Sequence, residues 1–425
     1  MDTVAERRCR HCSGKFTATL ARLGRMPVAN DYVDPAAPPL SDPRVELTVM
    51  VCGDCRLAQT LDFKDSADLF RADYAYFSSA STAWLDHARR YVNAMIARFE
   101  LLPGARHVEL ASNDGYLLQF SRAMELTVLG VEPCSSVAQA ASVLDIETRI
   151  EFFSQDCAKR LVDQGWRADL VTANNVFAHV PDVNDFARGM RDLLAPQGVA
   201  TIEVQHLLRL MQRNQFDTIY HEHFSYYSLL AAKRVFEGAG LRLFDVEELD
   251  THGGSLRYFV CRAEAKHVDT LAVQRVLQEE LAYGLDTDAV YDRFAERIIR
   301  VRQGFRDLLL RLNAEGRSVA AYGAPAKGVT LLNFCGVGPD LIAFTVDKAP
   351  SKQGRLIPGV RIPILPPEAL TEARPDYVVI LPWNLKDEII EQLAATADWK
   401  PDFITAIPEP MIIDRAAPGG RRHVA

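Results

Sequence analysis

Short runs of apolar residues alternate with amphipathic stretches through the middle of the chain. The runs at 108–111, 127–131, 169–173 and 199–204 have strand character, and helical patterns separate them. Strands that alternate with helices are typical of a parallel sheet, whose strands are covered on both faces. The pattern therefore predicts a parallel α/β sheet between residues 105 and 262.

Helical patterns border this sheet on both sides. Between residues 72 and 102, apolar side chains that include Trp84, Ala88 and Tyr91 recur on one face, which predicts a helix. A longer helical pattern covers 266–315 and is charged on one face. We expect it to connect two lobes of the protein.

A second series of strand-like and helical runs follows this connection. Strand character recurs at 318–322, 341–346 and 377–381, and helices are predicted around 327–334 and 385–394. The series predicts a second, Rossmann-like sheet. The tail from Ala416 onward contains little to bury and is expected to fray.

The length of 425 residues allows two to three domains. Residues 1–70 are rich in proline and turns, and too poor in apolar residues to form a core alone. We therefore predict an α/β protein with a small module over 1–70, a first α/β domain over 71–265, and a C-terminal α/β domain with its helical connector over 266–425. With 48% hydrophobic and 24% charged residues, the composition excludes a disordered chain.

The net charge of −8 argues against an extended electrostatic surface for nucleic acid. No stretch approaches 18 consecutive apolar residues, which argues against a membrane-spanning helix. The N-terminal residues have no apolar segment of the kind found in signal peptides. We therefore expect a cytoplasmic protein that binds neither nucleic acid nor membranes, and the sequence leaves its oligomeric state open.

The eight cysteines are distributed unevenly, and four of them lie in two CxxC pairs near the N-terminus. Cys9 and Cys12 form the first pair, and Cys52 and Cys55 form the second. Two such turns can complete a tetrahedral four-thiolate zinc site, and four protein ligands leave no open position, so its role would be structural. The stretch between the pairs is long enough for a small hairpin. The alternative is buried free thiols, and a redox role is disfavoured because neither pair belongs to a thioredoxin-like βαβ unit.

The first predicted strand of the middle sheet runs into a polar turn. The sequence from Glu109 to Tyr116 is Glu-Leu-Ala-Ser-Asn-Asp-Gly-Tyr. A turn at the carboxyl end of a strand, facing the start of a helix, is where α/β sheets bind nucleotide-like cofactors. This turn contains one glycine, whereas the dinucleotide fingerprint needs three. The second strand ends at Glu132 and Pro133, where a carboxylate can accept hydrogen bonds from both hydroxyls of a ribose.

A further strand of this sheet also ends in polar residues, among them Asn174, Asn175 and His179. The tips of three strands thus present polar groups to one edge of the sheet. This pattern is more typical of a methyltransferase that binds S-adenosylmethionine than of a dehydrogenase. The predicted donor-binding residues are Tyr74, Glu109, Ala111, Ser112, Asn113, Gly115, Tyr116, Glu132, Pro133, Asn174 and His179.

The segment from Tyr220 to Ser228 concentrates chemically active side chains. Its sequence is Tyr-His-Glu-His-Phe-Ser-Tyr-Tyr-Ser, which lacks the HExxH spacing of a catalytic zinc site. A histidine with a pKa near neutrality suits proton abstraction, and a neighbouring glutamate could orient it or raise its basicity. Tyrosine hydroxyls could stabilise an enolate oxygen. The alternative is an aromatic-rich core turn whose histidines serve only the fold.

In the second lobe, residues 320–328 form a strand, a turn of small residues and the start of a helix, which suits a diphosphate. Walker A spacing is absent, so ATP is not implied. Asp347 ends the following strand, where an acid could bind a ribose or a base. The turn at 251–255 either lines the cleft or simply closes a hairpin. The predicted substrate-binding residues are Tyr322, Gly323, Lys327, Asp347, Lys352 and Arg355.

Taken together, these motifs resemble the nucleotide-sugar C-methyltransferases of deoxysugar biosynthesis. The resemblance covers the two CxxC pairs, the segment Tyr-Ala-Tyr-Phe-Ser-Ser-Ala-Ser at 74–81, and the segments 109–116 and 220–228. The sequence Tyr-Gly-Ala-Pro-Ala-Lys-Gly at 322–328 is similar to that family's second Rossmann-like lobe. The resemblance implies a zinc-binding module, a class I methyltransferase domain and a C-terminal domain that binds the nucleotide sugar.

The resemblance also implies a reaction. Members of the family transfer a methyl group from S-adenosylmethionine to the carbon alpha to the ketone of an NDP-4-keto-deoxysugar, most often C3. His223 would be the base that removes the alpha proton. The predicted catalytic residues are His223, Glu222, Tyr220, His221, Tyr76 and Asn175, and either Tyr74 or Tyr76 would contact the substrate. The nucleotide would be TDP, with GDP and CDP as alternatives, and the stereochemistry and the other sugar substituents stay open.

Two other function classes compete with this one. An NAD-dependent sugar-nucleotide dehydrogenase or epimerase would use the C-terminal lobe for its cofactor, but both lobes lack the three-glycine fingerprint. A non-enzymatic binding protein built on the zinc module is disfavoured by the negative net charge and by the His-Glu-His sequence at 221–223.

Overall fold

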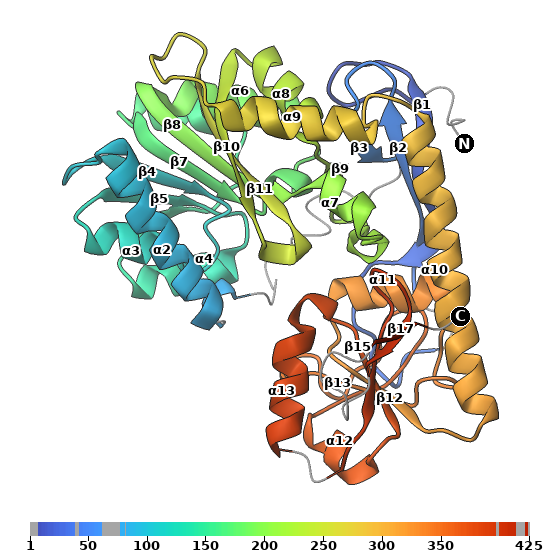
Figure 1. The fold of residues 1–425 in the computed structure, drawn as a ribbon. Helices are drawn as coiled ribbons and strands as arrows, with labels where there is room; N and C mark the ends of the chain where they lie inside the picture. The colour runs from blue at the N-terminus through green and yellow to red at the C-terminus, as the bar shows by residue number, and fades with distance from the viewer. Residues whose placement is uncertain are drawn as a thin grey trace.

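The computed structural model describes residues 7–38, 42–61, 77–80, 82–396, 399–413 and 421–423. These residues form three sheets: a small N-terminal one, a large one in the middle of the chain and a large one near its C-terminus. The two large lobes lie one above the other, and the small sheet and a long helix run along one side of both (Figure 1). The predicted α/β fold with two Rossmann-like lobes and a small module is confirmed.

The small sheet contains a hairpin and a strand from elsewhere in the chain. Its strands are β1 (Phe16–Pro27), β2 (Arg44–Cys52), β3 (Ala58–Thr60) and β9 (Ser225–Tyr226), in that order across the sheet. The antiparallel pairing of β1 with β2 confirms the hairpin predicted between the cysteine pairs. The edge strand β9 comes from the histidine-rich segment 220–228, so this segment is hydrogen-bonded to the small sheet.

The small sheet has no core of its own, as its composition predicted. Leu20 of β1 and Val49 of β2 are fully buried in one cluster with Phe294 and Leu308 of the long helix. At its other end, Cys52 joins the core of the middle lobe. Each end of the module therefore depends on apolar side chains from another part of the chain.

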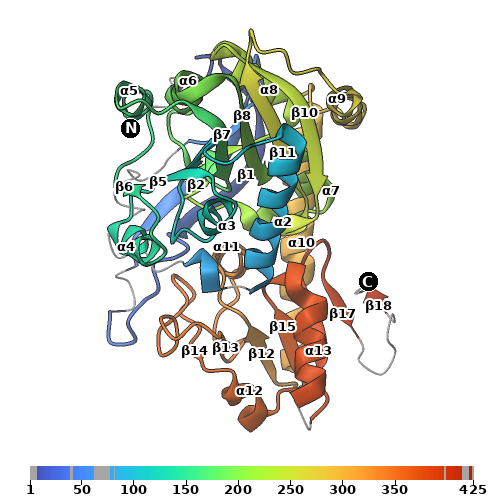
Figure 2. The same ribbon diagram turned by 90° about the vertical axis from the view of Figure 1, so that its left-hand side faces the viewer.

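The middle sheet has the strand order β10-β11-β8-β7-β4-β5-β6. Strands β8 to β6 are parallel, whereas β11 is antiparallel to both β8 and β10. Helices α2, α3 and α4 cover one face and α5, α6 and α8 the other (Figures 1 and 2). Its strands are β4 (Arg106–Leu110), β5 (Thr127–Val131), β6 (Thr148–Arg149), β7 (Ala168–Asn174), β8 (Leu194–Gln205), β10 (Leu241–Leu249) and β11 (Ser255–Arg262).

The helices of this lobe lie between these strands or immediately around them. They are η2 (Ser78–Ala80), α2 (Thr82–Phe99), α3 (Leu118–Ala123), α4 (Ser135–Val143), α5 (Gln155–Asp163), η3 (Phe177–His179), α6 (Val183–Leu193), α7 (Leu207–Gln212), η4 (Phe216–Thr218), α8 (Leu229–Gly238) and η5 (Thr251–Gly253). The helix predicted over 72–102 begins at Thr82 among the described residues, and 72–76 lie outside them.

The predicted connection over 266–315 consists of two helices, α9 (Leu271–Tyr283) and α10 (Ala289–Ala314). Gly284 ends α9 in a left-handed conformation with φ 96°, which a side chain would disfavour. The predicted helical stretch therefore consists of two helices, because the chain turns at this glycine. Helix α10 then runs along both the small sheet and the C-terminal lobe (Figure 1).

The C-terminal sheet has the order β14-β13-β12-β15-β16-β17-β18, and its first five strands are parallel. Its elements are β12 (Val319–Tyr322), α11 (Ala326–Cys335), β13 (Thr345–Val346), β14 (Ile364–Leu365), α12 (Glu368–Ala373), β15 (Tyr377–Ile380), η6 (Trp383–Leu385), α13 (Lys386–Thr396), β16 (Asp402–Thr405), β17 (Met411–Ile413) and β18 (Arg421–His423). Strand β13 is shorter than predicted. The tail does not fray throughout, because β18 pairs with the open edge of β17.

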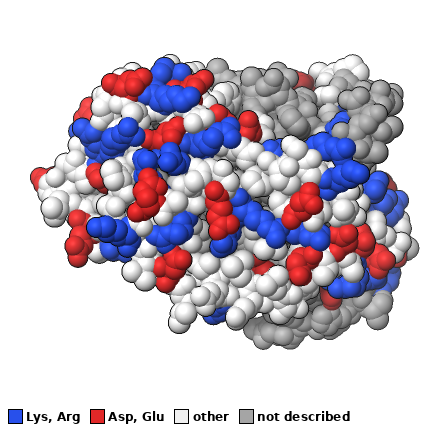
Figure 3. Space-filling model, turned by 90° about the horizontal axis from the view of Figure 1, so that it is seen from above, with Lys and Arg blue, Asp and Glu red and all other residues white. Residues whose placement is uncertain are grey.

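The surface carries charges of both signs. Lysine and arginine side chains alternate with aspartate and glutamate over the part of the upper face that the structure describes (Figure 3). None of the helices built from described residues combines the length and the hydropathy needed to cross a membrane.

Candidate active site

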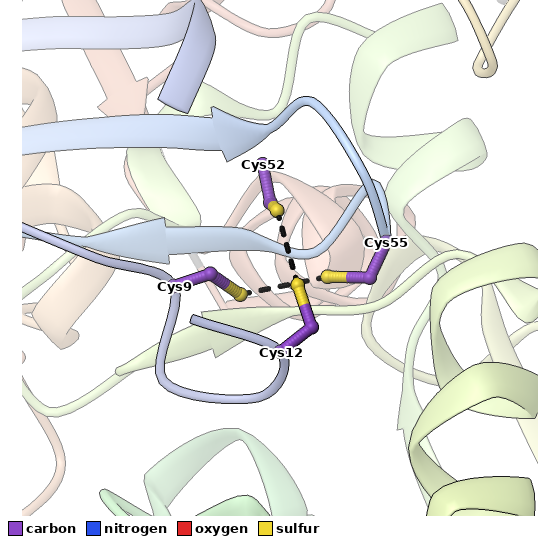
Figure 4. Close-up of side chains that lie close together, drawn as sticks. All are labelled: Cys9, Cys12, Cys52 and Cys55. Atoms are coloured by element: carbon purple, nitrogen blue, oxygen red, sulfur yellow. Dashed lines mark hydrogen bonds between the residues drawn. The ribbon is translucent and has the colours of Figure 1, made fainter. Parts of the chain in front are cut away.

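The four cysteines of the two CxxC pairs come together at the end of the small sheet. The Sγ atoms lie 3.5 Å apart in Cys9 and Cys55, 3.4 Å apart in Cys12 and Cys52, and all within 4.8 Å of one another. The side chains point toward a common centre (Figure 4). Zn–S bonds of about 2.3 Å in a tetrahedron place thiolates about 3.8 Å apart, so the set fits one zinc ion.

At the carboxyl edge of the middle sheet, strand β4 lies between β5 and β7, so the three predicted polar tips meet. The turn after β4 is tightly wound, with φ of 56° at Ala111, 50° at Asn113 and 77° at Gly115. A Cβ atom on Gly115 would lie 2.6 Å from a methyl group of Ile146. Glycine is therefore required there both by conformation and by space.

Three carboxyl groups crowd this edge. Glu132 accepts backbone hydrogen bonds from Asn113 at 3.0 Å and from Cys134 at 2.9 Å, which ties the turn after β4 to the end of β5. Burial raises the pKa of Glu132. Burial raises the pKa of Glu109 well above its ordinary value, and the negative charges of Glu132 and Asp114 raise it further. A cationic ligand would favour ionisation of both groups.

Several buried polar atoms at this edge have no hydrogen-bond partner within the described residues. They are Glu109 Oε2, Ser112 Oγ, Asp114 Oδ1 and Asn174 Oδ1. An unpaired buried polar group is costly, so such a cluster indicates a place where a polar ligand supplies the missing bonds. The edge therefore fits S-adenosylmethionine, which brings ribose hydroxyls, an amino group and a positive sulfonium. The rings of Tyr116 and Trp84 stack beside it with centroids 6.3 Å apart.

His223 lies beyond this edge, in the turn between η4 and β9. Its Nδ1 atom is 3.0 Å from the carbonyl oxygen of Thr218. Because a carbonyl oxygen only accepts, Nδ1 must carry the proton and Nε2 keeps its lone pair. Burial lowers the pKa of His223 well below 6.5, and His179 and His252 lower it further. The ring is thus held neutral in one tautomer.

Aromatic rings surround His223. The ring centroid of Tyr220 lies 4.1 Å from that of His223, that of His179 lies at 4.7 Å, and that of Tyr226 at 5.9 Å. His179 follows β7 directly, so it connects the polar edge of the sheet with His223. Its Nδ1 atom donates to the backbone carbonyl of Glu222 at 2.7 Å, and burial lowers its pKa to about 4.

The Glu222 carboxyl is held by Asn30 and not by either neighbouring histidine. It accepts hydrogen bonds from Asn30 Nδ2 at 3.1 Å and 3.0 Å, one to each oxygen. Burial raises its pKa to about 7. The sequence left open whether this glutamate orients the histidine or raises its basicity. In the structure the carbonyl of Thr218 orients the ring, and the Glu222 side chain is directed toward the cysteine module.

Two other predicted catalytic residues are hydrogen-bonded to neighbouring strands. His221 is buried and its Nε2 lies 3.2 Å from the carbonyl oxygen of Val45 in β2, so its ring faces the small sheet. Asn175 lies at the tip of β7 with φ 54°, and its backbone N–H donates to Glu203 at 2.7 Å. Tyr74 and Tyr76 fall outside the described residues.

The C-terminal lobe faces this segment through α11 and η6. Trp383 Nε1 donates to the buried Asp217 at 2.6 Å, and Lys327 lies over the Trp383 ring at 4.5 Å from its centroid. Lys327 Nζ also donates to Asn384 at 2.5 Å. Burial raises the pKa of Asp217 to about 6, whereas the charge of Lys327 opposes this shift. A lysine and a carboxylate from two lobes therefore meet next to the η4 turn.

The turn after β12 repeats the arrangement seen after β4. Asp347 accepts backbone hydrogen bonds from Ala324 at 2.8 Å and Ala349 at 2.9 Å. Lys352 Nζ lies 3.0 Å from the Ala324 carbonyl oxygen and 3.4 Å from Asp347. Tyr32 of the small module donates to the same carbonyl at 2.5 Å.

The remaining predicted substrate residues surround this turn. Tyr322 is buried at the end of β12. Gly323 has φ 87°, and a Cβ atom there would lie 2.6 Å from Pro382. Arg355 donates to the backbone carbonyl of Tyr32 at 3.4 Å. The structure thus brings all six predicted substrate residues to one side of the C-terminal lobe.

Comparison with known proteins gives matches along the whole chain. Residues 9–70 match a family described as a proposed zinc-binding domain, 84–246 a methyltransferase domain, and 250–408 a C-methyltransferase C-terminal domain. C-methyltransferase NovU of Streptomyces niveus is 36% identical over 405 residues, which cover 95% of this chain and 96% of NovU. The chain belongs to the C-methyltransferase family. The predicted class, an S-adenosylmethionine-dependent C-methyltransferase, is confirmed.

Solved structures resemble parts of this C-methyltransferase. Magnesium protoporphyrin IX methyltransferase (ChlM) from Synechocystis PCC 6803 with bound SAM is 13% identical and covers 42% of this chain and 81% of its own, with a TM-score of 0.32. An S-adenosylmethionine-dependent methyltransferase from Clostridium acetobutylicum ATCC 824 is 12% identical. The match covers 46% of this chain and 95% of that methyltransferase, with a TM-score of 0.33.

Several residues around this candidate site were not found from the sequence. They are Asn30, Tyr32, Asp217, His252 and Trp383, which lie on loops or short helices of all three parts. His252 carried one signal, because it lies in the turn at 251–255 that we considered for the cleft. Its ring lies 5.6 Å from that of Trp84, and its neighbour Gly253 packs on Trp383. This turn both closes the β10–β11 hairpin and faces the C-terminal lobe.

Proposed function

We propose that this C-methyltransferase methylates the carbon alpha to the ketone of a nucleotide-linked 4-keto-deoxysugar, at C3. The observation that carries the proposal is the hydrogen bond from His223 Nδ1–H to the carbonyl of Thr218. This bond leaves the Nε2 lone pair as the basic atom, and the lowered pKa of His223 keeps the ring neutral at neutral pH. The ring is therefore ready to remove a proton from carbon.

A C–H bond next to a ketone becomes nucleophilic only after it loses its proton. His223 Nε2 would take that proton, and the electron pair of the C–H bond would spread onto the ketone oxygen as an enolate. Tyr220 and His179 lie closest to the His223 ring, and a hydrogen bond from Tyr220 to the enolate oxygen would stabilise it. S-Adenosylmethionine supplies, when bound, the electrophilic methyl group that this carbon attacks.

The carboxyl edge of the middle sheet would hold the donor. Glu132 would accept hydrogen bonds from the ribose hydroxyls, and the unpaired oxygens of Glu109, Asp114 and Asn174 would face the polar groups of the donor. This assignment is supported by the convergence of three strand tips and by the carboxyl groups whose pKa values burial has raised. A positive sulfonium is attracted to such a site.

The C-terminal lobe would hold the nucleotide. The start of α11, with Lys327 on its first turn, and Lys352 after β13 would bind the diphosphate. We propose TDP as the nucleotide, with GDP and CDP as alternatives. The sugar would then extend from the C-terminal lobe toward His223, and Asn175 at the tip of β7 is a further proposed contact.

We also propose that the four cysteines bind one structural zinc ion. The distances between their Sγ atoms support this, and four thiolates leave no coordination position for substrate. Metal analysis of the purified protein should give about one zinc per chain. Replacing Cys52 with serine should lower the zinc content and the melting temperature together, and an unchanged metal content would contradict the proposal.

The direct test of the function uses S-adenosylmethionine labelled in its methyl group and a TDP-4-keto-deoxysugar. We expect the label to appear on the sugar carbon next to the ketone, which NMR of the product would identify as C3. Labelling of an oxygen or nitrogen would refute C-methylation of this substrate. Absence of label with TDP-, GDP- and CDP-linked keto sugars would refute the sugar-nucleotide assignment.

A further inference from the structure

The Glu222 side chain is anchored from a distant part of the chain. Asn30 follows β1 in the small module, in a turn closed by a hydrogen bond from Asp31 N–H to the Val28 carbonyl at 3.2 Å. Its Nδ2 atom donates to Glu222 Oε1 at 3.1 Å and to Oε2 at 3.0 Å. Both hydrogen bonds that the structure assigns to this carboxyl, within its described residues, therefore come from one amide.

The environment of Glu222 makes this amide important. Glu222 is only 5% exposed, and burial raises its pKa to about 7. Asp31 on the same loop also raises the pKa, whereas the Asn30 amide lowers it. Tyr32 on that loop and Tyr226 on β9 are the other titratable groups that face the carboxyl. No lysine or arginine among the groups acting on it provides a counter-charge.

Glu222 is also part of the turn that carries the proposed base. Its backbone carbonyl accepts the Nδ1–H of His179, and the next residue is His223. Phe224 N–H then donates to the Ala178 carbonyl at 2.8 Å. A displacement of Glu222 would thus move the rings of His179 and His223 relative to each other, although neither ring is bonded to Asn30.

We infer that Asn30 is a positioning residue for methyl transfer: from the cysteine module, it holds the Glu222 carboxyl and, through it, the turn that carries His223. The inference rests on the proposed function of His223. It gives the small module a direct part in the geometry of the reaction, beyond support of the fold.

The test compares Asn30→Ala with Asn184→Ala. Asn184 also links the module to the middle lobe, since its Nδ2 donates to the His11 carbonyl at 2.8 Å, but it does not touch Glu222. With labelled donor and the keto sugar, we expect Asn30→Ala to lower kcat about tenfold or more, while KM for both substrates changes less than about twofold. Asn184→Ala should keep kcat within about twofold of the parent protein. Asn30→Asp should lower kcat at least as much as Asn30→Ala, because it replaces the hydrogen-bond donor of the amide with a second carboxyl.

A pH profile separates positioning from general support of the fold. Removing the Asn30 amide should raise the pKa of Glu222, so the acidic limb of kcat should move to higher pH in Asn30→Ala and stay in place in Asn184→Ala. In a Glu222→Gln background, Asn30→Ala should no longer shift that limb. Equal losses of kcat in both asparagine variants, with unshifted pH profiles, would overturn the inference.

A measurement without turnover keeps the inference testable if the proposed substrate is wrong. A carboxyl with a raised pKa contributes stability below its ordinary pKa of 4.5 and loses it as the pH rises through about 7. The melting temperature of Asn30→Ala should therefore fall more steeply than that of the parent protein between about pH 5 and about pH 8.5. Identical slopes would overturn the inference, whereas failure of methyl transfer in the parent protein would overturn only the proposed function.

Discussion

The middle sheet and the C-terminal sheet share the order of their parallel strands. In both, the strands in chain order run 3-2-1-4-5 across the sheet. In both, an acid follows the second strand directly. It accepts one backbone hydrogen bond from the turn after the first strand and one from the residue two positions after the acid itself. Glu132 does so with Asn113 and Cys134, and Asp347 with Ala324 and Ala349.

The two sheet edges differ in the groups around this shared arrangement. In the middle sheet the acid has two further carboxyl groups beside it, Glu109 and Asp114. In the C-terminal sheet Lys352 contacts the acid, and Lys327 begins the adjacent helix. One strand order therefore carries a carboxyl-rich edge in one lobe and an edge with two lysines in the other, and this difference supports the proposed donor and nucleotide sites.

The largest effect is expected from His223, which lies outside both proposed binding sites. Replacing His223 with asparagine removes the proposed base, and general base catalysis contributes about 10²- to 10⁴-fold. We expect methyl transfer to fall by at least about a hundredfold, while calorimetry finds donor and TDP affinities within about twofold of the parent protein. His267→Asn is the control, because that ring contacts the Gln197 carbonyl on the far side of β8 from the site. Activity retained by His223→Asn would mean that another group is the base.

The second effect concerns only the proposed nucleotide site of the C-terminal lobe. Replacing Lys327 with methionine removes a proposed diphosphate contact, and a lost charge-assisted hydrogen bond of about 1.5–3 kcal/mol corresponds to roughly ten- to a hundredfold. We expect TDP affinity to fall by that factor and donor affinity to stay unchanged, as measured by calorimetry. Lys348→Met is a matched control, because Lys348 follows Asp347 but its Nζ bonds to Gln392. Equal losses in both variants would show that only general positive charge matters.

The third effect tests whether the two acids serve different ligands. Glu132→Gln should weaken donor binding about tenfold and leave TDP binding unchanged, since each carboxylate hydrogen bond is worth about 1.5–3 kcal/mol. Asp347→Asn should weaken TDP binding instead. Melting temperatures serve as the control, because both acids also support their own turns. If both variants weakened the binding of the same ligand, the assignment of the two binding sites would be wrong.

The smallest effect is the pH dependence of donor binding. Burial raises the pKa values of Glu109 and Glu132, and a cationic donor favours their ionised forms. Donor affinity should therefore rise as the pH increases above the ordinary glutamate pKa of 4.5, because donor binding releases the protons that these groups hold. Calorimetry in buffers of different ionisation enthalpy would count the protons. A flat profile would contradict the carboxyl-rich assignment.

Local patterns predicted much of this molecule because they reflect local physics. Buried parallel strands appear as apolar runs, and the spacing of Cys9 and Cys12 reflects the reach of two thiolates on one turn. The bonds that assemble the site have no such signal: Asn30 meets Glu222 across 192 residues, Tyr32 meets Ala324 across 292, and Trp383 meets Asp217 across 166. A single polar residue on a loop is typical of any surface, and only the fold gives it a partner.

The absence of a separate core in the cysteine module bears on how the protein is made. The apolar face of β1 and β2 rests on α10, which is synthesised more than two hundred residues later. As the chain leaves the ribosome, the module can gather its cysteines but has nothing against which to bury Leu20 and Val49. Its apolar strands therefore reach their final packing only after α10 has emerged, although they are synthesised long before it.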